Sequence, residues 1–260
     1  MAANWTLLWQ LLRHEVQERY AGTALGVFWL LAQPLFMLLV YALVFGEILQ
    51  MRLGTETATD TDSGQFAGWL FAGLIAFNAL AEVLTRAPAI LTERRDLLLN
   101  SPLPPAVLPL LPVGVSLVLE GVSVGLLLLW LCVQGRCEPL GVVFYLPFLG
   151  VRLLFSLAFA YGLAVLGVFL HDLRQMMPPL LTVLLLVSPI VYPLSVVPEA
   201  FQGWFVWNPL AHLVEGYRAA LLDGRFLWEA FLGLLLLASA SLALGWWLFQ
   251  HLLLRARYVL

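Results

Sequence analysis

The sequence contains no lysine, and this absence excludes two kinds of chemistry. All 13 basic residues among its 260 are arginine. The phosphate-binding loop of many ATPases needs a lysine after its glycines, so this chain cannot hydrolyse ATP by that route. A Schiff base also needs a lysine amine, so covalent catalysis of that type is excluded as well.

Metal ligands and catalytic groupings are also scarce. The four histidines lie far apart and form no metal-binding spacing such as H-E-x-x-H. Cys132 and Cys137 lie near the outer end of one apolar stretch; their spacing allows a disulfide, but we expect two unpaired thiols. No G-x-S-x-G motif or pair of carboxylates stands out. We therefore expect neither an enzyme nor a chain that holds its own metal or cofactor.

Charge is the third shortage, and it indicates a membrane protein. Only 11% of the residues are charged and 62% are hydrophobic, whereas a soluble domain has about 25% charged residues. A bilayer core of about 30 Å needs about 20 apolar residues in a helix. We predict an all-α integral membrane protein, a single transmembrane domain over residues 1–260. Its six expected spans are about 26–45, 66–91, 107–132, 140–170, 178–194 and 227–254.

Two segments predict helices that do not cross the membrane. In residues 4–20, Trp5, Leu8, Leu12 and Val16 recur at helical spacing with charges on other faces, which is typical of an amphipathic helix in the membrane interface. A soluble helix without a partner is the alternative. Residues 196–226 hold two short helical pieces that meet at Asn208-Pro209. Each piece is too short to cross, so we expect a re-entrant or interfacial hairpin on the outer face.

The arginines also predict the orientation of the chain. With six spans both termini share one side, and the loops on that side hold seven arginines against four on the other. The positive-inside rule then places both termini in the cytoplasm. The seven are Arg13, Arg19, Arg94, Arg95, Arg174, Arg255 and Arg257, and the four are Arg52, Arg136, Arg218 and Arg225.

Charges at membrane depth need partners. Glu120 and Arg152 lie about midway through the third and fourth spans, at heights that differ by about 8 Å. We predict a structural ion pair, because a lone charge there costs at least about 2.5–3.5 kcal/mol. Exposure to an aqueous path is the alternative. Glu82 and Arg86 have the i, i+4 spacing of a helical ion pair.

Most aromatic residues of the first span are expected to face lipid or to pack in the core, and a minority could line a substrate path, where flat apolar faces offer weak, non-directional contacts. Trp29 and Phe36 lie two turns apart on one face, beside Gln33, the most polar side chain of the span. Because lipid penalises Gln33, we expect this face to turn inward. Phe28 and Tyr41 lie elsewhere on the helix and are expected to pack or to anchor the span.

Several motifs together resemble a known family. The junction "RYAGTALGVFW…QP" leads into the first span, and "LTERRDLL" follows the second. The later segments "GVFLHDLRQM", "SPIVYPLSVVP" and "NPLAHLVEGYRAALL" occur in the expected order. Over almost its entire length the chain resembles ABC-2 type permeases, specifically the branch that exports O antigen, teichoic acid or capsule.

The resemblance implies a mechanism and partners. Such permeases act in the bacterial inner membrane as homodimers with a pore between the subunits. Two separate ATPase subunits bind ATP and Mg and dock underneath; the cargo is a lipid-linked polysaccharide, with no nucleic acid involved. Residues 4–20 would be the interface helix, 92–100 the coupling helix and 196–226 the outer gate. The implied residues are Arg13, Arg19, Arg94, Arg95 and Asp96 for coupling, and Asn208, Pro209, Leu213 and Tyr217 for the gate, the last two facing the partner or the pore axis.

Three alternatives stay open on the sequence alone. One is an ABC-2 permease for a drug or small lipid. The aromatic residues of the first and fourth spans favour a polymer substrate over this alternative. Another is an ion-coupled secondary transporter that uses Glu120 or Arg152, although we find no inverted repeat of the kind such transporters often show. A membrane-embedded transferase is disfavoured by the shortage of paired acidic residues.

Overall fold

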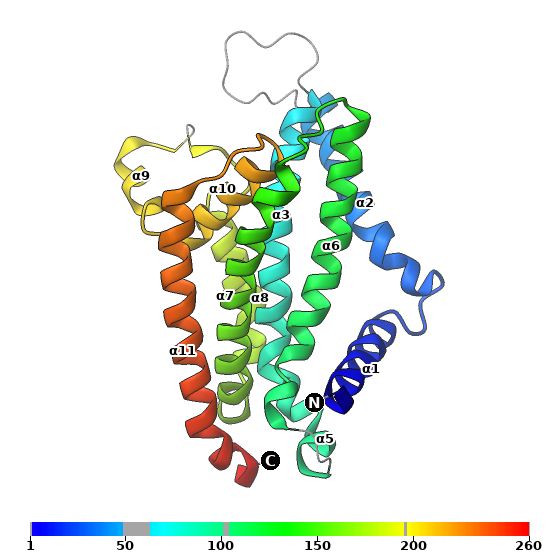
Figure 1. Ribbon diagram of the computed structural model, residues 1–260, viewed down its shortest axis with the longest axis vertical. Coiled ribbons are helices and arrows are strands. Elements are labelled where there is room, and N and C mark those ends of the chain that lie inside the picture. The colour runs from blue at the N-terminus through cyan, green and yellow to red at the C-terminus, as the bar shows by residue number, and fades with distance from the viewer. Residues whose placement is uncertain (1, 49–62, 101–103, 195–196, 260) are drawn as a thin grey trace.

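The structure, a computed structural model, describes residues 2–48, 63–100, 104–194 and 197–259. Within these ranges the regular elements are helices, and no strand occurs. Figure 1 shows a bundle of long, roughly antiparallel helices. The main helices are α1 (Ala2–Arg19), α2 (Trp29–Tyr41), α3 (Ser63–Arg86), α4 (Ile90–Glu93), α5 (Arg95–Asn100), α6 (Leu110–Val133), α7 (Gly141–Phe169), α8 (Leu173–Val187), α9 (Glu199–Phe205), α10 (Pro209–Leu221) and α11 (Trp228–Val259).

Five helical segments in the described ranges are long and apolar enough to cross a membrane, one fewer than predicted. They are Gly26–Phe45, Gln65–Glu93, Pro105–Val133, Gly141–Phe169 and Trp228–Ala256. These five agree with the predicted spans, and they make the chain a multi-pass membrane protein.

The remaining predicted span, 178–194, differs from the helix observed. Helix α8 begins earlier, at Leu173, and ends at Val187 after 15 residues, about 22 Å, which is short of a bilayer core of about 30 Å. Its end has a local cause. Ser188 is extended (ψ 146°) because the following Pro189 disfavours a helical conformation in the residue before it.

Helix α7 lies at the centre of the bundle and is approached closely at glycines. A Cβ added to Gly245 of α11 would lie 2.3 Å from the carbonyl oxygen of Ala158. A Cβ added to Gly167 of α7 would lie 1.9 Å from the carbonyl oxygen of Pro88. Small residues permit such backbone contact between membrane helices, where hydrophobic association is weak and van der Waals packing must replace it.

Helix α2 lies at the periphery. In Figure 1 it angles away from the bundle, towards α1, and Leu38 is its buried residue. Phe28, just before it, and Phe36 within it are 57% and 62% exposed. Most of its apolar surface therefore meets lipid or another chain.

The two ends of the bundle carry different features. Helices α1 and α5 and both ends of the chain lie at one end, whereas α9 and α10 lie at the other (Figure 1). The predicted helix 92–100 is divided, because the backbone at Arg94 (φ −106°, ψ 31°) leaves the helical region between α4 and α5. The pattern predicted for 4–20 depends partly on side chains before Trp9, which lie outside the described part of the structure.

The contact between α7 and α11 predicts opposite effects for one substitution at two sites. Gly245→Ala should lower the free energy of unfolding by about 1–3 kcal/mol, because the new methyl group overlaps the α7 backbone. Gly233→Ala on the same helix, where nothing lies within 4 Å, should be neutral or stabilising, since alanine favours helix. Thermal unfolding in detergent measures both. Equal behaviour of the two variants would contradict the close α7–α11 packing.

Candidate functional site

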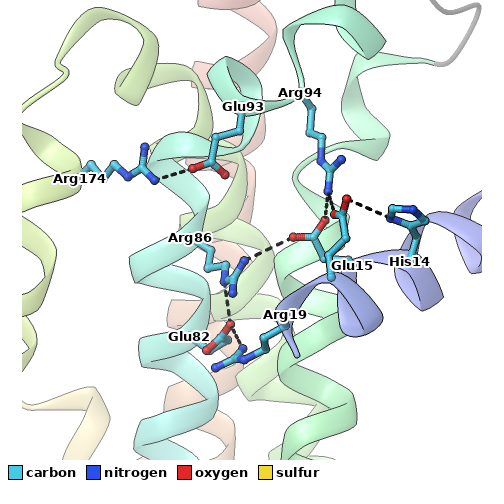
Figure 2. Close-up of polar contacts among 9 residues, drawn as sticks. His14, Glu15, Arg19, Glu82, Arg86, Glu93, Arg94 and Arg174 are labelled. Atoms are coloured by element: carbon cyan, nitrogen blue, oxygen red, sulfur yellow. Dashed lines mark hydrogen bonds and ion pairs between the residues drawn. The ribbon is translucent and has the colours of Figure 1, made fainter. Parts of the chain in front are cut away.

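A network of charged side chains joins α1 to α3 and to the break between α4 and α5 (Figure 2). Its hub is Glu15 of α1, which is 9% exposed. Arg94 donates to one oxygen of Glu15 at 2.7 Å, and Arg86 lies 3.4 Å from the other. One carboxylate thus bridges the end of α3 and the α4–α5 break.

A second carboxylate, Glu82 of α3, extends the network. Arg19, the last residue of α1, donates to it, and Arg86 donates to the same oxygen at 3.1 Å. Arg94 also donates to Glu18 at 2.5 Å. These bonds join ionised partners, which makes them stronger than neutral hydrogen bonds. We call Glu15, Glu18, Arg19, Glu82, Arg86 and Arg94 the charged network.

Two further pairs of charged or titratable side chains lie beside the charged network. His14 lies 3.3 Å from Glu18, and on the other side Arg174 of α8 pairs with Glu93 at 2.5 Å, with both side chains largely exposed. The hydrogen bond from Arg94 lowers the pKa of Glu18 below its ordinary 4.5. The Arg94–Glu18 pair is therefore lost only as the pH falls through this lowered pKa.

Packing holds α1 at this position as well. Leu12 rests on α6 where Gly114 leaves room, since an added Cβ there would lie 2.7 Å from the leucine. Glu15 follows Leu12 by three residues, so both point from the same side of α1. Of the predicted coupling residues, Arg19 and Arg94 join the charged network. Arg13, Arg95 and Asp96 are exposed.

Sequence reasoning missed the hub. Glu15 stands among several charged residues of α1 and is distinguished from them only by its position next to Leu12 on the packed side. The pair Glu82–Arg86 was predicted from its spacing and is present at 3.1 Å.

A second polar cluster lies inside the bundle. Arg152 of α7 pairs with Glu120 of α6, and neither side chain is exposed. Tyr145 and Tyr217 donate to the other oxygen of Glu120, at 3.0 and 2.5 Å. Arg152 also donates to two serine hydroxyls, those of Ser116 at 3.0 Å and Ser156 at 3.3 Å. Helices α6, α7 and α10 therefore meet at one carboxylate.

Arg218, which sequence reasoning placed in an outer loop, is also buried. It is 4% exposed and donates to three backbone carbonyls: Trp69 of α3 at 3.1 Å, Pro189 at 3.1 Å and Ile190 at 2.6 Å. Its guanidinium carbon lies 3.4 Å from the centre of the Trp69 ring, a cation–π contact. Gly73 makes room, since a Cβ there would lie 2.5 Å from the guanidinium.

The predicted gate residues need one correction. Leu213 and Tyr217 were expected to face the partner subunit or the pore axis, but they are 1% and 0% exposed within this chain. That expectation is wrong because the hydroxyl of Tyr217 turns inward to Glu120. Asn208 caps α10 by accepting from Leu210 at 3.0 Å and donates to Ser188 at 3.0 Å, and Pro209 takes the first helical position.

The predicted path residues do not all share one surface. Gln33 lines a cavity between α2, α3 and α6, as does Tyr41. Trp29 and Phe36 are 40% and 62% exposed and do not belong to the lining of that cavity. Gln33 borders the cavity but is itself exposed, as are Trp29 and Phe36, so the face that was expected to turn inward is not buried within this chain. Cys132 and Cys137 are unpaired and exposed.

These features define a helical, multi-pass membrane protein with buried polar anchors inside and a charged network at the end that holds both termini. A sequence model described as "ABC-2 type transporter" matches residues 6–222. The chain belongs to the ABC-2 type transporter family. Its members are membrane subunits of transporters, so the chain is a transport protein and not an enzyme.

Several relatives carry names that refer to export. The chain is 29% identical to the O-antigen export system permease protein RfbA of Myxococcus xanthus, over 92% of this chain and 88% of that protein. A Klebsiella pneumoniae protein of the same name is 21% identical over 83% and 80%. The polysialic acid transport protein KpsM of Escherichia coli is 28% identical over 81% and 79%.

The buried pair predicts strong coupling between two substitutions. Glu120→Gln or Arg152→Gln alone should each cost about 3–5 kcal/mol, because each leaves the other charge buried without its partner. The double variant should cost less than the sum by about 1–3 kcal/mol. Unfolding in detergent gives the free energies for this double-mutant cycle. As a control, Glu120→Gln combined with Arg174→Gln changes two distant sites, and their free-energy costs should add. Additivity at Glu120 and Arg152 would mean that they do not interact.

The hub predicts that a neutral residue at position 15 releases α1. Glu15→Gln should weaken the contacts of Arg86 and Arg94 together, whereas His14→Gln removes an exposed side chain next to it and should have little effect. Spin labels on α1 and α6, in a background with both native cysteines replaced by serine, report the separation. We expect a broader and longer distance distribution for Glu15→Gln alone. An unchanged distribution would show that packing at Leu12 suffices.

Proposed function

We propose that this chain is the membrane subunit of an ATP-driven exporter that moves a lipid-linked polysaccharide across the bacterial inner membrane. The observation that carries the proposal is similarity over most of the chain to permeases named for O-antigen export and to a polysialic acid transport protein. Because two differently named polymers occur among these relatives, the proposal is polysaccharide export in general, without a particular sugar repeat.

The energy must come from outside the chain, which has no lysine for a phosphate-binding loop. In the proposed assembly two copies of the chain enclose the pore, and two ATPase subunits that bind ATP and Mg dock at the end with both termini. That end is cytoplasmic by the arginine distribution. The exposed apolar surface of α2 is available to the second copy or to membrane lipid.

The charged network gives this assembly a route for mechanical coupling. Arg95 and Asp96 are exposed beside the network, where an ATPase can reach them. Arg94, the residue before them, is tied to Glu15 and Glu18. A displacement of α5 is therefore transmitted to α1, and from α1 to the start of α2.

The polymer path and the outer closure complete the proposal. Trp29 and Phe36 present aromatic surface for weak sugar contacts, on a helix with few contacts within the chain. Closure at the outer end is assigned to α9 and the Asn208-Pro209 junction, because Leu213 and Tyr217 are buried. A substitution of Asn208 would disturb this junction, because it removes both the N-terminal cap of α10 and the hydrogen bond to Ser188.

Charge reversal tests the coupling route. The variant Arg94→Glu with Arg95→Glu should insert normally but reduce surface polysaccharide at least about tenfold, since the reversed charge at position 94 repels Glu15 and Glu18. Arg174→Glu, which breaks one exposed pair, is the matched control and should export nearly as well as the native chain. Quantified surface polysaccharide, divided by membrane abundance of the protein, measures the effect. Normal export by the double variant would remove α4–α5 from the coupling route.

A further inference from the structure

A cavity of about 610 Å³ lies between α2, α3 and α6 and has two kinds of wall. One kind is polar and includes Gln33 of α2 together with Asn78 and Thr85 of α3. The other kind is apolar and is contributed by Leu30, Pro34, Met37, Phe71, Leu74 and Ile75. Such a mixture suits a ligand with a polar head and an apolar tail, because hydrocarbon alone would leave the amides without hydrogen-bond partners.

The charges of the cavity are concentrated at one end. Arg19, Glu82 and Arg86 of the charged network line it there, and both arginines donate to the same oxygen of Glu82. Arg86 also lies near Glu15, but that carboxylate is held more closely by Arg94, at 2.7 Å against 3.4 Å. Two guanidinium groups therefore converge on one carboxylate oxygen at the cavity wall, within a network that is neutral overall, since it holds three arginines and three glutamates.

The carboxylate of Glu120, the remaining charged residue of the lining, adds no attraction for a cation. Glu120 lines the cavity but already accepts from Arg152, Tyr145 and Tyr217. The charged groups that a ligand could reach are thus the guanidinium groups of Arg19 and Arg86, whose side chains are 23% and 36% exposed. Paired guanidinium groups favour phosphate, because their planar donors match its oxygens.

We propose that this cavity binds a phosphorylated lipid, with its phosphate or diphosphate on Arg19 and Arg86 and its tail along the apolar wall between α2 and α3. The anion takes the place of Glu82 as the shared acceptor of the two arginines. Asn78 and Gln33 supply amide groups to the linkage between phosphate and sugar. The proposal rests on the proposed function, because a lipid-linked polysaccharide carries both a phosphate group and a tail, and it assigns the place where the chain receives that lipid.

The position of α2 supports entry from the membrane. Helix α2 forms one wall of the cavity, yet most of its own surface is exposed and Leu38 is its buried residue. A tail can therefore enter beside α2 from lipid, while the head stays at the level of the charged network, next to water. Because α1 ends at Arg19, the same binding event also bears on the helix that carries the hub Glu15.

Three probes separate the sources of the phosphate. Farnesyl diphosphate carries head and tail, inorganic pyrophosphate the head alone and farnesol the tail alone. Each is added to the purified full-length chain in detergent, together with any subunit that co-purifies, and the shift in thermal unfolding is measured. We expect farnesyl diphosphate to stabilise the protein at concentrations where the other two do not. Equal stabilisation by pyrophosphate would indicate a free-anion site, and equal stabilisation by farnesol an apolar site; either result overturns the proposal.

Substitutions assign the site. Arg19→Gln with Arg86→Gln should weaken farnesyl diphosphate binding at least about tenfold, a loss of about 1.4 kcal/mol, whereas Arg174→Gln, an arginine outside the cavity, should bind like the native chain. Glu82→Gln keeps the shape but removes the competing charge, so it should bind the probe more tightly. This opposite sign decides the case if the double arginine variant fails to fold. Unchanged or weaker binding by Glu82→Gln overturns the proposal.

The binding assay uses neither ATP nor export, so it fails independently of the proposed function. If farnesyl diphosphate binding depends on Arg19 and Arg86 but the protein does not export polysaccharide, the proposed function is wrong and the proposed lipid site stands. If the protein exports polysaccharide but does not bind farnesyl diphosphate in this way, the proposed lipid site is wrong and the proposed function stands.

Discussion

The hydrocarbon core of a membrane offers no water to hydrogen-bond, so every polar group buried there needs a partner inside the protein. Glu120 shows what this constraint does to the architecture. Its carboxylate is bound by Arg152 and Tyr145 of α7 and by Tyr217 of α10. The adjacent Arg218 binds carbonyls of α3 and of the segment after α8. Two neighbouring residues of α10 thus bind it to α3, to α6 and to the segment after α8.

The charged network at the opposite end has a different physical character. All its members except the buried Glu15 are partly exposed, and two of its carboxylates, those of Glu15 and Glu82, have two basic partners each. Such contacts exchange partners at low cost, whereas a deeply buried pair loses several kcal/mol when one partner leaves. In the proposed exporter, α1, α5 and the start of α2 would therefore move, while the cluster around Glu120 would stay rigid. The phosphorylated lipid proposed for the cavity would act where these two regions meet.

The sequence predicted the helical class and most spans because long apolar runs have few alternatives in a membrane. It also predicted contacts fixed by local geometry or by depth, such as Glu82–Arg86 and Glu120–Arg152. The partners of Glu15 lie 71 and 79 residues away, so they depend on how helices pack and could not be deduced from spacing.

The misassigned elements have similar causes. Tyr217 turns inward because a buried carboxylate accepts its hydroxyl, and α8 is shorter than the predicted span because Ser188 precedes a proline. The break at Pro189 was visible within residues 178–194, whereas the inward turn of Tyr217 depends on a carboxylate 97 residues away and could not be read from the sequence.

Reconstitution tests the central claim most directly. The purified chain and the proposed ATPase subunit are placed in vesicles with lipid-linked polysaccharide on the ATPase side, and the fraction of polymer protected from an external glycosidase is followed over time. If the chain is the proposed exporter, protection should require ATP and should not occur with an ion gradient alone. Protection driven by a gradient without ATP, or ATP hydrolysis that moves no polymer, would contradict it.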